Sequence, residues 1–177
     1  RSLCNHPYYP LQPGYEVHYE IQSRDAAGVP KTYHYSQAVT EAEANSVSLR
    51  TQFQDLGERG SGEISSTQVV NCEDGTLRAN AYFDLGSRLS SRAGDVKVET
   101  RRVTGQLLPS DLRVGSEWDG SFDVSMRPTG AGARSALGAE GIDLTIRTHR
   151  RVVAEERVTV PAGTYKALKI EASTDFG

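Results

Sequence analysis

The sequence predicts an all-β protein in which a curved, mostly antiparallel sheet forms an open or incomplete barrel. Apolar and polar residues alternate with a period of two along most of the 177-residue chain, as expected for strands that bury one face. The alternating runs follow one another without a helical period between them, and turns rich in Gly and Pro separate them. A Leu-x-x-Gly-x-Glu turn occurs at 11–16 and again at 112–117, which suggests two similar halves.

The expected strands begin with the clearest one, at 15–22, where every second residue is aromatic or aliphatic and the residues between are polar. The other strands are expected, in chain order, at 33–39, 47–53, 64–70, 77–83, 96–98, 118–126, 142–146 and 168–172. This pattern gives about nine or ten strands in all. Turn sequences at 25–28, 72–75 and 161–163 reverse the chain between neighbours, so the topology is expected to be largely a meander.

Two segments depart from the alternation. Residues 40–45 have a helical composition but are too few for more than a single helical turn. Residues 129–141 are rich in Gly and Ala and contain little to bury, which predicts a mobile loop. The whole chain, 1–177, is expected to form a single β domain, with half-repeats suggested at 9–107 and 108–177.

Composition and charge limit the classes of function. The chain carries 20 Lys and Arg against 23 Asp and Glu, a formal net charge of −3 at pH 7, so no sequence-wide positive field would attract a nucleic acid. No apolar run approaches the roughly 20 residues of a membrane-spanning helix, so no transmembrane segment is expected. No cofactor motif is found, and no cofactor is expected. The last strand is barely complete at Gly177, and the natural protein is expected to continue beyond it.

Cys4 and Cys72 are the only cysteines, and they lie too far apart in sequence for a metal knuckle or a Cys-x-x-Cys redox motif. A disulfide between them is the preferred interpretation, because it would tie the N-terminal arm to the end of a strand. Such a bond implies an oxidising compartment. Two unrelated free thiols are the alternative.

Two motifs carry a family likeness. One is the Leu-x-x-Gly opening at 9–19, echoed at 111–122 with Trp118 where the first copy has Val17, and the other is Val-Pro-Ala-Gly-Thr-Tyr at 160–165. In these motifs the chain resembles poorly characterised bacterial envelope proteins and lipoproteins, and it is similar to the open barrels of lipoprotein-localisation carriers, which hold acyl chains in a concave face. The resemblance implies a non-catalytic extracytoplasmic protein that is secreted, periplasmic or lipid-anchored. By fold analogy alone it implies a lipid or another amphiphilic small molecule as ligand.

Two arginines interrupt apolar rows and are the first candidate ligand-binding residues. Arg150 breaks the row that begins at Ile142, and Arg102 breaks the row of the strand before Trp118. Burial of an unpaired guanidinium is costly, so each side chain is expected to reach an anion, a carboxylate or water. In a curved sheet the two arginines could hold the acidic head of an amphiphile, while Trp118 and Tyr19 lie on the apolar face that takes its tail. The alternative is that the arginines extend into solvent or guard a sheet edge, and that the protein is an interaction module of the envelope.

Two further constellations carry less specific signals. Glu117, Asp119 and Asp123 share one face of a strand, which is the basis for an alternative hypothesis of a hydrolase that uses carboxylates. The His and Glu side chains of 16–20, together with His34, are of the types that bind zinc. They are expected on a wet, flat face without supporting groups, so no metal site is predicted.

Overall fold

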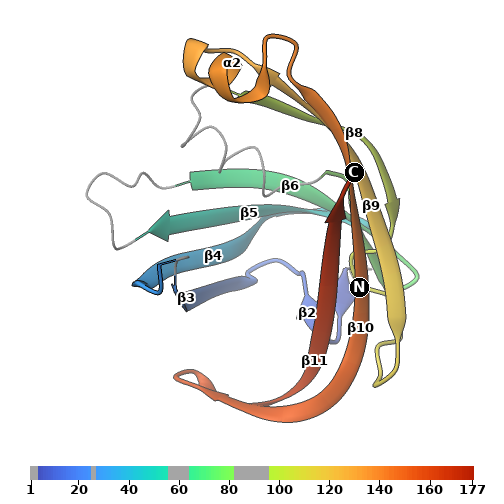
Figure 1. Cartoon of the computed structure of the whole chain (residues 1–177). Helices are drawn as coiled ribbons and strands as arrows, with labels where there is room; N and C mark the ends of the chain where they lie inside the picture. The colour runs from blue at the N-terminus through green and yellow to red at the C-terminus, as the bar shows by residue number, and fades with distance from the viewer. Residues whose placement is uncertain (1–3, 25–26, 56–63, 82–95) are drawn as a thin grey trace.

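The computed structural model describes residues 4–24, 27–55, 64–81 and 96–177. Within these residues the protein is almost entirely β structure, with one short helix (Figure 1). The elements are β1 (Asn5–His6), β2 (Tyr9–Pro10), β3 (Glu16–Arg24), β4 (Pro30–Ala42), β5 (Ser46–Asp55), β6 (Ile64–Glu73), β7 (Thr76–Ala79), β8 (Val96–Gly105), β9 (Glu117–Pro128), α2 (Ala131–Leu137), β10 (Ile142–Val160) and β11 (Gly163–Phe176).

Two antiparallel meanders make up the fold. The first sheet has the order β3-β4-β5-β6-β7, the second has the order β11-β10-β9-β8, and β1 and β2 form a separate short hairpin. At Leu77, β7 of the first sheet meets the connection between β8 and β9: the amide of Leu77 donates to the carbonyl oxygen of Leu108 at 2.8 Å, and its carbonyl accepts from the amide of Leu107 at 2.8 Å. Figure 1 shows the second sheet curving around the first. The prediction of a curved, open, mostly antiparallel β fold is therefore confirmed.

The apolar rows of both sheets lie on one face, which we call the inner face. It carries the buried side chains of Leu49 and Val70 in the first sheet and of Phe122 and Ile146 in the second. Complete burial of such a side chain contributes about 1.5 to 3 kcal/mol, so these rows hold the sheets in their curved arrangement. A third, smaller cluster consists of Leu112, Trp118 and Val152. The opposite face, which we call the outer face, carries most of the ion pairs described below.

The N-terminal arm is attached to the first sheet by a disulfide between Cys4 and Cys72, which confirms the preferred pairing. The two Cα atoms are 5.1 Å apart, and the bond spans a sequence separation of 68. His6 is also buried, with its Nε2 atom 2.9 Å from the carbonyl oxygen of Pro109 and its Nδ1 atom 3.2 Å from the amide of Tyr8. Since Nδ1 accepts the amide proton, Nε2 is the donor to Pro109. The arm therefore contacts the connections of both sheets.

The strands occur where the alternation predicts them, but several are longer than expected: β8 continues to Gly105, β10 continues to Val160 and β11 begins at Gly163. Residues 40–45 do not form a helical turn, because β4 continues to Ala42 and pairs with Val47 of β5 after a register shift at Val39. Pairing along β5 outweighs the weak local preference of a short segment for helix. At the other end of this sheet β7 ends at Ala79, and the last two residues of the strand expected at 77–83 lie outside the described residues.

The segment expected to be a mobile loop, 129–141, contains α2. The helix packs against β9, and Ala133 is completely buried there beside Phe122 and Met126. Mobility of the segment stays a prediction, as does the division into half-repeats at 9–107 and 108–177. The division between the two sheets falls between β7 and β8, so β8 pairs with β9 across the suggested boundary.

Candidate ligand-binding face

Arg150 lies on the inner face of β10, directly opposite Trp118 of β9 in the strand register. Its Nη1 atom donates to Oγ1 of Thr148 at 2.9 Å, and that hydroxyl donates to the carbonyl oxygen of Gly120 at 3.3 Å. A Cβ atom added at Gly120 would lie 3.0 Å from Oγ1 of Thr148 and 3.8 Å from Nη1 of Arg150. The absence of a side chain at Gly120 therefore makes room for the Thr148 hydroxyl, which accepts from the half-buried guanidinium.

Trp118 is a core residue next to this arginine. Its side chain is buried with Leu112 and Val152, and its indole Nε1 donates to the carbonyl oxygen of Leu107 at 3.1 Å. A buried indole N–H needs such a partner, and this bond fixes the ring. Trp118 can therefore support Arg150 by packing, while its own surface is largely covered.

Arg102 occupies the other face of the second sheet. The register between β8 and β9 shifts between Thr100 and Arg102, and this β-bulge turns Arg102 toward the outer face. Its Nε atom donates to Oδ2 of Asp123 at 2.8 Å, and its side chain is 72% exposed. Simple alternation places Arg102 in the apolar row because it does not account for the extra residue of the bulge. In the structure Arg102 therefore lies on the outer face and Arg150 on the inner face.

The inner face of the first sheet carries a set of apolar side chains that we call the aromatic end. Its members come from β3, β4 and β5 and are Tyr19, Ile21, Tyr33, Tyr35 and Phe53. The ring centroids of Tyr19 and Tyr35 are 5.9 Å apart, and those of Tyr33 and Phe53 are stacked at 5.0 Å. Tyr19 is 51% exposed and Ile21 is 40% exposed, whereas Leu49 further along the same face is completely buried. Alternation predicted the direction of these side chains, but it could not show that the core stops short of them.

Two further tyrosines lie beside the aromatic end: Tyr9 belongs to β2 of the N-terminal arm, and Tyr15 directly precedes β3. The rings of Tyr9 and Tyr15 meet edge to face at 5.8 Å, and the hydroxyl of Tyr9 donates to Oε1 of Gln37 at 2.8 Å. Burial raises the pKa of Tyr9 well above its ordinary value and raises the pKa of Tyr15 to about 12. Both phenols therefore stay protonated and uncharged at physiological pH, which keeps this part of the inner face free of negative charge.

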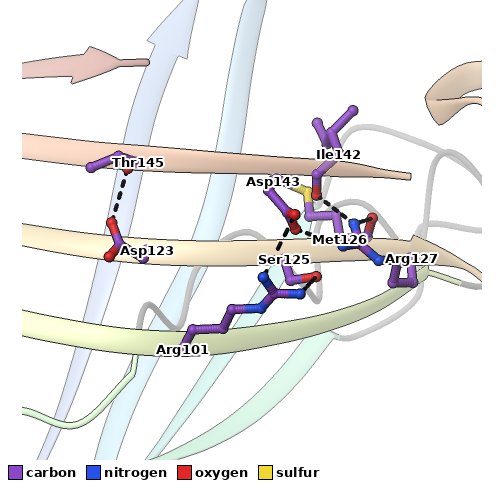
Figure 2. Close-up of polar contacts among 8 residues, drawn as sticks. All are labelled: Arg101, Asp123, Ser125, Met126, Arg127, Ile142, Asp143 and Thr145. Carbon is purple, nitrogen blue, oxygen red and sulfur yellow. Dashed lines mark hydrogen bonds and ion pairs between the residues drawn. The ribbon is translucent and has the colours of Figure 1, made fainter. Parts of the chain in front are cut away.

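The outer face of the second sheet is held by polar contacts between neighbouring strands, part of which Figure 2 shows. Oγ1 of Thr145 donates to Oδ1 of Asp123 at 2.9 Å, and Nη2 of Arg127 donates to Oδ1 of Asp143 at 2.7 Å. The hydrogen bond from Thr145, followed by the charge of Arg102, lowers the pKa of the Asp123 carboxyl. These contacts connect β8, β9 and β10 across the sheet.

The carboxylates on which the hydrolase hypothesis rests belong to the same network. Oε1 of Glu117 lies 3.2 Å from Nε of Arg151, and Oδ1 of Asp119 lies 2.8 Å from Nδ1 of His149. A general acid needs a raised pKa, whereas that of Asp123 is lowered. The arrangement is therefore that of cross-strand pairs which stabilise a sheet.

His149 has a second neighbour of chemical interest, because Ser173 of β11 lies opposite it in the register. Asp119, His149 and Ser173 therefore form a row on the outer face and line a hollow of about 440 Å³. The hydrogen bonds among the described residues include none between Ser173 and His149, and both members of the Asp119–His149 pair are more than half exposed. The row lacks the contact that activates a serine nucleophile.

The His and Glu residues of the first sheet lie on its outer face. Nε2 of His18 is 3.0 Å from Oε1 of Glu16, while His34 is opposite Glu20 in the register and lines a hollow of about 400 Å³ with it. Across the described ranges, no three His, Cys, Asp or Glu side chains are grouped closely enough to hold a metal ion.

The chain belongs to the DUF3108-like family, whose profile matches residues 17–176. It is similar in structure to a Bacteroides fragilis protein with a YmcC-like fold that is provisionally described as exported, with 15% sequence identity and a TM-score of 0.54. The match covers 96% of this chain and 78% of the other chain, and at this identity it concerns the fold alone. No curated protein matches the chain.

Within the described ranges, no helix combines the length and the apolar character that crossing a bilayer requires.

Proposed function

We propose that the protein is a non-catalytic, extracytoplasmic binding protein that holds an apolar or amphiphilic molecule on the inner face of its curved sheet. The observation that carries this proposal is the aromatic end, where the inner face keeps an apolar surface exposed. Tyr19 and Ile21 are 51% and 40% exposed there, on the same face as the completely buried Leu49. A contiguous exposed apolar patch is typical of a ligand or partner site, and a curved sheet gives it a concave support.

Three of the sequence-derived candidates receive different roles in this proposal. Tyr19 contacts the apolar tail, because it is the most exposed ring of the aromatic end. Arg150 binds the acidic head, since its guanidinium is held beside Thr148 on the inner face and its positive charge attracts a carboxylate or phosphate. Trp118 supports Arg150 from the core. Arg102 takes no part, because it pairs with Asp123 on the outer face.

The compartment is part of the same proposal. The disulfide between Cys4 and Cys72 supports an oxidising environment outside the cytoplasm. The similar Bacteroides protein is described as exported, which agrees with this location. Secreted, periplasmic and lipid-anchored forms are all compatible with this location. The resemblance to lipoprotein-localisation carriers predicts that the ligand carries an acyl chain.

A titration of the purified protein with a fluorescent fatty acid, cis-parinaric acid, tests the proposal. We expect saturable binding that oleate displaces. Tyr19→Ser should weaken binding about tenfold, which corresponds to a loss of about 1.4 kcal/mol. Tyr165→Ser is the matched control, because Tyr165 is equally exposed, at 52%, but lies near the β10–β11 turn. The affinity of this variant for the fatty acid should equal that of the wild type. Absence of saturable binding, or equal losses in the two variants, would contradict the proposal.

The head-group assignment is tested separately with Arg150→Gln. This variant should weaken the binding of oleate but leave the binding of oleyl alcohol, which has the same chain without the carboxylate. Arg102→Gln removes an equal charge from the outer face and should change neither affinity. Thermal unfolding of both variants shows whether they remain folded. Equal effects on the acid and the alcohol would remove Arg150 from the site.

A further inference from the structure

Among the described residues, strand β11 is an edge strand of the second sheet. It has 14 residues, Gly163–Phe176, and among the described residues it pairs only with β10 (Figure 1). Its side chains are mostly exposed, including Ile170 at 39% and Phe176 at 62%. A long open edge presents a row of backbone donors and acceptors that favours pairing with another strand, and proteins normally cover or interrupt such edges.

The backbone groups at this edge can be identified from the last contact of the strand. The amide of Gly177 donates to the carbonyl oxygen of Thr145 at 2.9 Å, and the amide of Thr145 donates to the carbonyl oxygen of Gly177 at 2.7 Å. In an antiparallel pair such reciprocal bonds recur at every second residue. The odd-numbered residues of β11 therefore bond to β10, while the even-numbered ones from Thr164 to Phe176 direct their N–H and C=O groups to the open edge. The register shift near Val152 lies in β10 and leaves this alternation of β11 intact.

We propose that two copies of the chain associate by antiparallel pairing of β11 with β11, about a two-fold axis at Ile170. In this register, residues at equal distances from Ile170 face each other across the axis. The even-numbered residues then supply all of the new hydrogen bonds. Because Ile170 lies next to the middle of the strand, this axis pairs nearly the whole of β11, from Thr164 to Phe176. A shared two-fold axis is the commonest arrangement of soluble homodimers.

Charge complementarity selects this register over its neighbours. On the outer face Lys169 of each copy lies opposite Glu171 of the other, so two opposite-charge pairs form. An axis at Lys169 or at Glu171 would place like charges opposite each other. Both side chains are exposed, and neither forms an ion pair with the described part of its own chain. On the inner face the same register brings Ile170 onto Ile170 and Leu168 onto Ala172, which are apolar contacts.

The proposal is independent of ligand binding, since Tyr19 and Arg150 do not belong to β11. Its test is light scattering after size-exclusion chromatography of the whole chain over a range of concentrations. We expect a dimer for the wild type. Lys169→Glu and Glu171→Lys should each raise the dimer dissociation constant at least about tenfold, because each creates two like-charge pairs. The double variant K169E/E171K should restore it, because the opposite-charge pairs return with reversed sign.

A wild-type monomer, or a dimer that is indifferent to the three variants, would overturn the proposal. Thermal unfolding shows that each variant is folded, which matters for Glu171→Lys because Arg151 faces that position on β10. A second measurement does not depend on charge. Ile170→Cys should form an intermolecular disulfide under mild oxidation, since the two copies of residue 170 meet at the axis. Thr164→Cys is the control and should stay monomeric on a non-reducing gel, because its two copies lie at opposite ends of the paired strands.

Discussion

The first sheet, β3–β7, and the second sheet, β8–β11, are both antiparallel meanders, but they cover their inner faces differently. In the second sheet α2 places the buried Ala133 over β9, and Trp118 closes the region next to Val152. In the first sheet the arm covers the part between Cys72 of β6 and Gln37 of β4, where Leu11 is completely buried and Tyr9 donates to Gln37. Within the described residues the aromatic end lies beyond that cover. The difference shows that one alternating pattern gives a buried core or an exposed apolar surface, depending on which other segments cover it.

The outer faces also differ. In the second sheet ion pairs run from strand to strand, such as Arg102 with Asp123 and Arg151 with Glu117. In the first sheet Arg78 of β7 lies 3.7 Å from Glu73 of β6, while the contact between His18 and Glu16 is made within a single strand. Cross-strand pairs stabilise a sheet directly, whereas pairs within a strand do not join neighbours. The first sheet also has a covalent link, the disulfide between Cys4 and Cys72, and we expect its stability to depend on this bond.

The largest expected effect tests this dependence. Cys4→Ser combined with Cys72→Ser should lower the free energy of unfolding by about 4 kcal/mol, because the disulfide no longer restricts a long loop of the unfolded chain. Urea unfolding followed by circular dichroism measures the loss. A change of less than about 1 kcal/mol would mean that the arm adds little to the first sheet and would break the comparison.

The next effect asks whether the two sheets form one cooperative unit. Leu49→Ala in the first sheet and Ile146→Ala in the second each remove a completely buried side chain and should each cost about 3 kcal/mol. If the chain is a single domain, both variants shift one common transition in calorimetry. Two transitions, each sensitive to one variant, would support independently stable halves.

The sequence predicted the strands well because a period of two is a local property. It did not predict which part of the inner face stays exposed, because the exposure of Tyr19 depends on how far the N-terminal arm and α2 extend over the sheets. It also missed the bulge at Arg102, because one extra residue reverses every later side chain without leaving a signal in composition. The hydrogen bond of His6 to Pro109 was missed for a similar reason: the two residues are 103 positions apart.

A smaller effect concerns the cover of the second sheet. Trp118→Phe keeps most of the buried ring but removes the indole donor to the carbonyl oxygen of Leu107. We expect a loss of about 1 to 2 kcal/mol in the free energy of unfolding, because that carbonyl loses its partner and some volume is left empty. Trp118→Tyr provides a comparison with a different polar atom. If Trp118→Phe unfolds at the same urea concentration as the wild type, the hydrogen bond from Trp118 to Leu107 does not contribute to stability.

The smallest effect is a pH dependence of the second sheet. The pKa values of Asp123 and Asp143 are lowered in the folded protein, chiefly by hydrogen bonds from Thr145 and Ser125. Such groups contribute stability above their unfolded pKa of about 3.9, and this contribution disappears as the pH falls through the folded pKa. The melting temperature should therefore decrease as the pH is lowered below about 4, and the double variant D123N/D143N should show a smaller decrease. Identical slopes would contradict the assignment.

The central claim is that the uncovered part of the inner face holds an apolar or amphiphilic molecule, and native mass spectrometry tests it most directly. Protein exported by a bacterial host and purified without detergent should carry a co-purifying small molecule with an acyl chain. Tyr19→Ser should lose this molecule, while Tyr165→Ser should retain it. A spectrum in which the wild type has only the mass of the polypeptide, and stays so after incubation with oleate, would contradict the claim.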